Sequence, residues 1–241
     1  MTVYAPKSIY VGSRLCPSYD AVKDAITKLK DKIKDTVNPK SIPEFIRHHN
    51  LFTLYAVWHF SFATACRAIV TPYLYLSEID QESGLGCLAD KDDGRGYKSR
   101  LIWLARQIIV QMQQYESHLS ALRAQLPSNA VMAAPCYFFQ DEDPEFYVPI
   151  EVRPKTLQPI MADFLDYPAN FHRRFLRNEL LERGCPVEVV DAFMGHWKAG
   201  EEPWAVHSSF SFAGYCAELN AYLIPFLKDL GLVPLKSSLC R

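Results

Sequence analysis

No two of the seven cysteines form a CxxC pair, and their number is odd. Cysteines at short paired spacing would indicate a zinc site or a disulfide framework, so we expect neither here. Unpaired cysteines instead favour a reducing, cytoplasmic location. The chain also has almost no net charge, with 26 basic and 27 acidic residues. Without an overall positive field, binding to nucleic acid would depend on a local basic patch.

Long apolar runs are scarce as well. The first twenty residues contain none, so no signal peptide is expected. The one candidate for a membrane span, residues 51–66 (LFTLYAVWHFSFATAC), is short, contains His59 and is followed at once by Arg67. We therefore predict a buried core helix over residues 50–69 and no membrane association.

The chain does have the size and composition of a globular protein, with 241 residues of which 49% are hydrophobic. Apolar residues at helical spacing predict several helices, and a turn-rich stretch between short β-like runs at 87–89 and 101–104 predicts a hairpin. The expected fold class is mainly α with a small β-sheet (α+β). We expect residues 1–44 to form an arm with one amphipathic helix, and residues 45–241 to form the main domain. The other helices are predicted near 105–126, 157–165, 170–184, 187–194 and 210–230, with one more strand near 146–154.

Several basic side chains could meet an anion. Arg67 ends the predicted core helix, and its guanidinium, which stays charged, needs either a carboxylate such as Asp80 or a bound phosphate. Arg173 and Arg177 are four residues apart on one helix face, where nearby carboxylates or a bound anion could neutralise them. His196 follows a glycine at a helix end, a position typical of a capping or core residue as well as of a catalytic one.

Taken together, these pieces resemble the catalytic domain of the tyrosine recombinase (phage integrase) family. RRFLRNELLERGCPVEVVDAFMGH, residues 173–196, is similar to the family's second-arginine helix, glycine, short helix and Gly-His. Arg173, Gly184 and Gly195 follow one another at intervals of eleven residues, as in the family. FATACRAIVTPYLYLSEID resembles the first-arginine segment, and ADKDDGRGYKSRLIWLA resembles the lysine hairpin, with Lys91 placed 24 residues after Arg67.

The resemblance implies a fold and a chemistry. Residues 45–241 would adopt the recombinase catalytic fold and would break and rejoin DNA through a 3′-phosphotyrosine, without a metal or another cofactor. Arg67 and Arg173 would clamp the phosphate with His196 as a further donor, while Lys91 would protonate the leaving oxygen. The nucleophile would be Tyr215. The DNA backbone would be contacted by Lys98, His172, Arg174 and Arg177.

The implied partners are double-stranded DNA and further copies of the chain assembled on it. The implied setting is recombination or integration of a mobile element. The chain is short for a protein that would also carry the family's usual N-terminal DNA-clamping domain.

The sequence departs from the family pattern near the nucleophile. Ala205 stands nine residues after His196, where the family usually has its tyrosine. The loop GEEPWAVHSSF shifts the equivalent position to Tyr215, with Tyr222 as a second candidate. Asn170 also replaces the histidine or lysine usual three residues before the second arginine. The alternative is therefore a truncated or catalytically inactive relative that acts as a DNA-binding or interaction module. A third reading, from another class, is a helical interaction protein without a DNA role.

Overall fold

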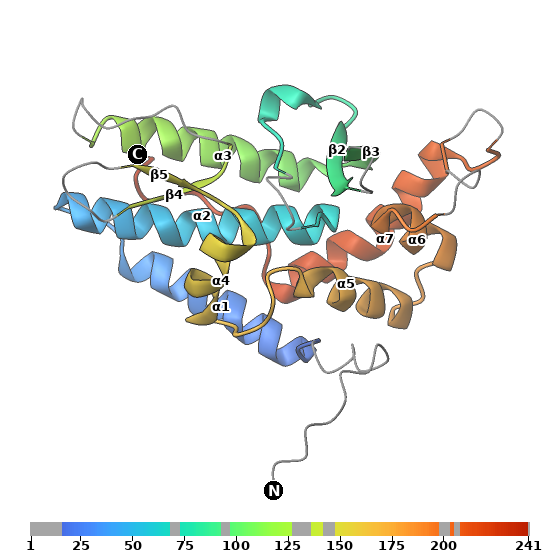
Figure 1. The fold of residues 1–241 in the computed structure, drawn as a ribbon, viewed down its shortest axis with the longest axis horizontal. Coiled ribbons are helices and arrows are strands. Elements are labelled where there is room, and N and C mark those ends of the chain that lie inside the picture. The colour runs from blue at the N-terminus through green and yellow to red at the C-terminus, as the bar shows by residue number, and fades with distance from the viewer. Residues whose placement is uncertain are drawn as a thin grey trace, which may run out of the picture.

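The computed structural model describes residues 16–67, 73–92, 97–126, 136–141, 148–197, 203–204 and 208–240, without the side chains of 90–98. Within these ranges the chain forms seven α-helices and two small antiparallel sheets (Figure 1). The predicted class, mainly helical α+β, is confirmed at this level.

The helices are α1 (Tyr19–Asp35), α2 (Ile42–Thr64), α3 (Arg106–Arg123), α4 (Pro154–Ala162), α5 (Phe171–Glu182), α6 (Val187–Met194) and α7 (Phe212–Leu230), with a 3-10 turn, η2, at Leu76–Glu78. One sheet has the order β1 (Ile79–Asp80), β2 (Leu85–Asp92), β3 (Tyr97–Trp103), and the other pairs β4 (Phe138–Gln140) with β5 (Pro149–Glu151).

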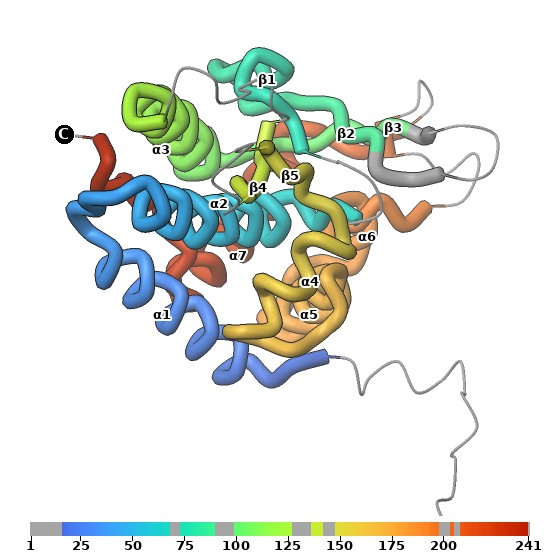
Figure 2. Tube along the Cα trace, turned by 60° about the vertical axis from the view of Figure 1, so that its left-hand side comes forward, coloured from blue at the N-terminus to red at the C-terminus, as the bar shows by residue number. Residues whose placement is uncertain are grey.

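Helix α2 forms the centre of the fold. Every side chain from Phe52 to Thr64 is buried, as expected for a helix that is apolar on all sides. The helices α1, α3, α4, α5 and α7 and the strand β4 pack around it (Figure 2). No helix in the described ranges has the length and apolarity needed to cross a membrane.

The boundaries of α2 differ from the predicted 50–69. The helix begins at Ile42, because Pro43 fits the first turn, where a missing backbone N–H costs nothing. It ends at Thr64, because Ala65 adopts a left-handed conformation with φ of 50°. The earlier end places Arg67 three residues beyond the helix rather than within it.

Helix α1 is the predicted amphipathic helix, with Val22, Ile26, Leu29 and Ile33 on its buried face. These side chains belong to the same hydrophobic core as α2 and α7. The ammonium group of Lys30 donates a hydrogen bond to the carbonyl oxygen of Gly231 at 3.1 Å. The helix predicted as part of an arm is therefore packed onto the main core.

The predicted hairpin consists of β2 and β3, which pair in register from Leu85 opposite Trp103 to Asp92 opposite Tyr97, with one bulge. It lies beside the C-terminal end of α2 and near α6 (Figures 1 and 2). Helices α5 and α6 end where the sequence predicted, because Gly184 and Gly195 adopt left-handed conformations with φ of 85° and 66°. The ends of α2 and α6 meet beside the first turn of α5, where Arg173 binds the carbonyl oxygens of Ala65 and Met194.

Candidate functional site

The candidate site is built on the chain that leaves α2. His172, on α5, donates from Nε2 to the carbonyl oxygen of Cys66 at 2.8 Å. This bond fixes the backbone just before Arg67, which is half-buried. Asp80, the carboxylate considered as a partner of Arg67, accepts hydrogen bonds from the backbone N–H of Glu82 and the hydroxyl of Ser83.

Arg173 lies at the middle of the site. Its side chain, also on α5, is buried, and its guanidinium donates to the carbonyl oxygen of Ala65 and to that of Met194, the latter at 2.8 Å. The same guanidinium lies 3.2 Å from Nε2 of His196. Arg173 therefore connects the ends of α2 and α6 with the histidine predicted to act beside it.

His196 is neutral in this arrangement and accepts a hydrogen bond from Arg173. Its pKa is lowered from 6.5, first by burial and then by the positive charges of Arg173 and Arg67. A guanidinium has no lone pair to offer, so Nε2 accepts from Arg173 and the ring proton is on Nδ1. The Nδ1–H group can then donate to an oxygen of a bound anion.

A pocket of about 350 Å³ opens beside these side chains. Its walls come from α5, the turn before it and the end of α6, and are formed by Pro168, Asn170, Phe171, Arg173, Arg174, Arg177, Met194 and His196. The guanidinium of Arg177 lies 3.7 Å from the carboxylate of Asp191. Four of the predicted residues thus share one cavity, which is large enough for a phosphate group.

The hairpin lysines are placed only through their backbone. Lys91 and Lys98 pair with each other near the end of the β2–β3 ladder. Their side chains lie outside the described part of the chain, so the predicted role of Lys91 as an acid is neither supported nor opposed.

His172 was predicted to contact DNA, but its side chain is buried. It is 2% exposed, and its ring packs 5.9 Å from that of Phe62. In this conformation it supports the backbone before Arg67 and does not face a surface on which DNA could lie.

Tyr215, the predicted nucleophile, is enclosed by aromatic rings. Trp204, Phe210 and Phe212 lie with their ring centroids 4.9, 5.9 and 6.0 Å from its own. Burial raises the pKa of the Tyr215 hydroxyl well above 10, so the group is protonated and is not activated. Tyr222, the second candidate, is half-buried further along α7.

His196 also lines a second pocket, of about 320 Å³, which is bounded by α6, Trp197 and Phe210. Phe210 packs on Tyr215 as well, so one ring contacts the predicted nucleophile and lines this pocket.

Arg100, on β3, is a member of the site that sequence analysis did not identify. It is 6% exposed and donates to the carbonyl oxygens of Phe193 and Thr64, both at 2.8 Å. The available signal was its position two residues before Ile102, because alternate residues of a strand face the same side. That face proves to be the buried one.

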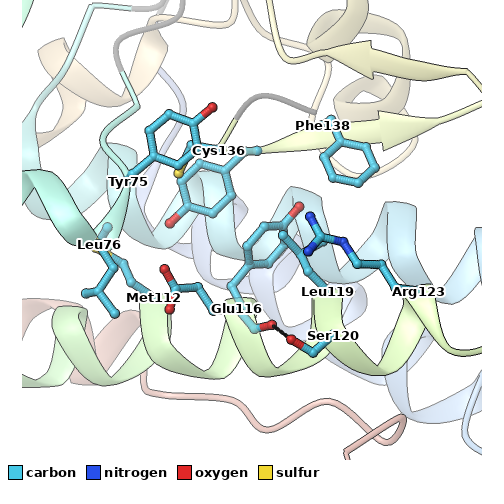
Figure 3. Close-up of a pocket in the computed structure, with 11 residues that line it drawn as sticks. Tyr75, Leu76, Met112, Glu116, Leu119, Ser120, Arg123, Cys136 and Phe138 are labelled. Carbon is cyan, nitrogen blue, oxygen red and sulfur yellow. Dashed lines mark hydrogen bonds between the residues drawn. The ribbon is translucent and has the colours of Figure 1, made fainter. Parts of the chain in front are cut away.

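A further pocket, of about 290 Å³, lies between α3, η2 and β4 and contains none of the predicted residues. Figure 3 shows Glu116 and Arg123 of α3 on one side, and Tyr75, Cys136 and Phe138 on the other. No group of three or more histidine, cysteine or acidic side chains suited to a metal occurs in the described ranges.

A scan against protein-family models finds no matching family, and a search of curated proteins finds no match. The resemblance to tyrosine recombinases thus stays a prediction from the motifs quoted above.

Proposed function

We propose that this protein is a DNA strand transferase of the tyrosine-recombinase type, with the corresponding catalytic fold. One observation supports this most strongly. Arg67, Arg173 and His196, which are far apart in the sequence, gather at the end of α2, and Arg173 binds both the backbone before Arg67 and the ring of His196. These are the three residues that the resemblance assigns to the scissile phosphate.

The chemistry of the proposal follows from these groups. In the transition state, phosphorus has five oxygen neighbours and negative charge collects on the non-bridging oxygens. Arg67 and Arg173 would stabilise that charge through charge-assisted hydrogen bonds, and the Nδ1–H of His196 would add a neutral donor. A site that already holds its positive charges in place needs little reorganisation when the charge develops.

The covalent step would join the Tyr215 oxygen to phosphorus and break the bond from phosphorus to the 5′-oxygen. The tyrosine proton would pass to water, and Lys91 would give a proton to the departing oxygen. The phosphotyrosine keeps the energy of the broken bond, so the reverse attack by a 5′-hydroxyl can rejoin DNA without a nucleotide cofactor.

Tyr215 must leave its aromatic cluster for this step. We infer that DNA binding displaces Phe210 and the start of α7, so that the tyrosine enters the pocket lined by His196. The buried conformation would then be the resting state, in which the hydroxyl is protonated and shielded from water.

The second candidate function is that of a DNA-binding relative without chemistry. The aromatic enclosure of Tyr215 and the presence of Ala205 at the usual tyrosine position favour it. The two candidates differ in one product: only the enzyme forms a protein–DNA adduct that survives denaturation. Incubation with junction DNA, followed by a denaturing gel and a parallel gel-shift assay, therefore distinguishes them.

A further inference from the structure

Arg100 reaches the site from the hairpin, an element separate from α2, α5 and α6. It lies on β3, two residues after Lys98, whose backbone partner on β2 is Lys91. Its buried side chain extends to carbonyl oxygens at the ends of two helices, α2 and α6. It therefore provides a direct link from the hairpin to the groups around the phosphate pocket.

Arg100 and Arg173 make parallel sets of contacts. Arg100 donates to Phe193 and Thr64 at 2.8 Å and to Ala65 at 3.3 Å. Arg173 donates to the neighbouring carbonyl of Met194 and to the same carbonyl of Ala65. The last carbonyls of a helix lack partners within it and carry partial negative charge. Two guanidiniums thus hold two such helix ends together.

We call this pair of guanidiniums, with the helix ends that they join, the clamp. The residues that follow the clamp in the sequence are the ones assigned to the phosphate. Arg67 comes two residues after Ala65, and His196 comes two residues after Met194. The separation of the two helix ends therefore sets the position of Arg67 relative to His196. A shift of about 1 Å in such a separation is enough to lower the rate of a reaction that needs both groups.

Gly195 provides independent evidence that this contact is tight. A Cβ atom at this position would lie 2.8 Å from Cδ of Arg100, closer than real Cβ contacts come. The φ of 66° at the same residue also favours glycine. The glycine before His196 thus allows both the turn out of α6 and the close passage of the Arg100 side chain.

We propose that Arg100 is a positioning residue, which holds the ends of α2 and α6 at the separation that places Arg67 and His196 on one phosphate. Its effect on catalysis rests on the proposed function, whereas the clamp itself does not. A lysine at this position would keep the charge but could not span both helix ends, because it has a single nitrogen.

The test compares Arg100→Lys with the matched control Arg106→Lys, since Arg106 is an exposed arginine at the start of α3. Two quantities are measured: the titration of His196 by NMR, and the rate of adduct formation on nicked junction DNA. We expect Arg100→Lys to move the His196 pKa upward, toward 6.5, because burial and the approach of Arg173 both relax. We also expect the adduct rate to fall about tenfold with DNA affinity within about threefold, and the control to change neither.

The two measurements separate the two proposals. If the wild-type chain forms no adduct, the proposed function fails, while the His196 titration still tests the clamp. An unchanged His196 titration in folded Arg100→Lys would overturn the positioning role. Should Arg100→Lys not fold, Arg100→Gln is measured instead. Failure of both variants to fold would also overturn the proposal, because it would assign Arg100 to the whole fold rather than to the site.

Discussion

Acidification from pH 7 to pH 5 should destabilise the protein through a chain of buried histidines. The hydroxyl of Ser237 lies 3.1 Å from Nε2 of His48 and 2.7 Å from Nδ1 of His118. The chain continues from Nε2 of His118 to Nδ1 of His49 at 3.0 Å. All three histidines are fully buried. They connect α2, α3 and the C-terminal segment without passing through the candidate site.

The magnitude follows from the pKa values. Burial lowers the pKa of His48 to about 4 and that of His49 to about 3, and it lowers that of His118 well below 6.5. In the unfolded chain each would titrate near 6.5. As the pH falls, the unfolded state therefore takes up protons first. The stability is complete above about pH 6.5 and is lost progressively down to the folded-state values.

At pH 5, His48 and His49 each lower the free energy of unfolding by about 2 kcal/mol, because pH 5 lies about 1.5 pH units below their unfolded-state pKa, at about 1.4 kcal/mol per unit. Together they remove about 4 kcal/mol, a large part of the stability of a typical domain, and His118 adds to the loss in the same direction. The expected result is partial or complete unfolding near pH 5, even though the carboxylates are still mostly ionised there.

Urea denaturation at pH 7, 6 and 5 measures this loss directly. The control is His118→Gln, which cannot take up a proton and should reduce the pH dependence of the unfolding free energy. An unfolding free energy that differs by less than about 1 kcal/mol between pH 7 and pH 5 would refute the reasoning.

Three further predictions concern the site. Gly195→Ala should lower the free energy of unfolding by about 2–4 kcal/mol, because a positive φ and a close contact combine at this residue. Gly184→Ala should lower it by about 1 kcal/mol, because no atom lies within 4 Å of the new Cβ. Thermal melts of the two variants test the difference. Arg173→Gln should destabilise the fold by about 2–3 kcal/mol through unsatisfied helix-end carbonyls, as seen by urea denaturation. DNA binding, measured by fluorescence anisotropy, should be weak and steeply salt-dependent, with a slope near −4 in a plot of log affinity against log salt concentration. Arg174→Ala should make that slope less negative by about one.

Each of these predictions has a contradicting result. Equal destabilisation by the two glycine variants would show that the contact with Arg100 is unimportant. An Arg173→Gln protein as stable as the wild type would mean that the helix ends find other donors. Tight DNA binding that changes little with salt would exclude recognition based on phosphate contacts.

Most of the helical fold could be predicted from local signals. Helix α6 matches the predicted 187–194, because Pro186 and Gly195 mark its two ends. The start of α2 was predicted eight residues too late, because the apolar run begins only at Leu51, whereas the helix begins at Ile42 with Pro43 in its first turn. Local signals such as proline and glycine thus predict that a helix exists more reliably than they predict its first residue.

The candidate site was predictable only in part. The spacings indicated that Arg173 and His196 would meet, and the guanidinium of Arg173 does lie 3.2 Å from Nε2 of His196. The joint role of Arg67 with them on one phosphate stays a prediction. Arg100 was missed because the alternation with Ile102 shows only that the two residues share a face of the strand, whereas which face is buried depends on long-range contacts. The enclosure of Tyr215 has the same origin, since Trp204 and Phe210 approach it from a loop of irregular sequence.

The central claim is that Tyr215 attacks DNA at a phosphate held by Arg67 and Arg173. The most direct test incubates the chain with a nicked suicide duplex, made from the DNA junctions that flank the gene of this chain, in the presence of a metal chelator. We predict a covalent protein–DNA adduct on a denaturing gel, which is lost in Tyr215→Phe and retained in Tyr222→Phe. An adduct that persists in Tyr215→Phe, or no adduct with any related junction, would contradict the claim.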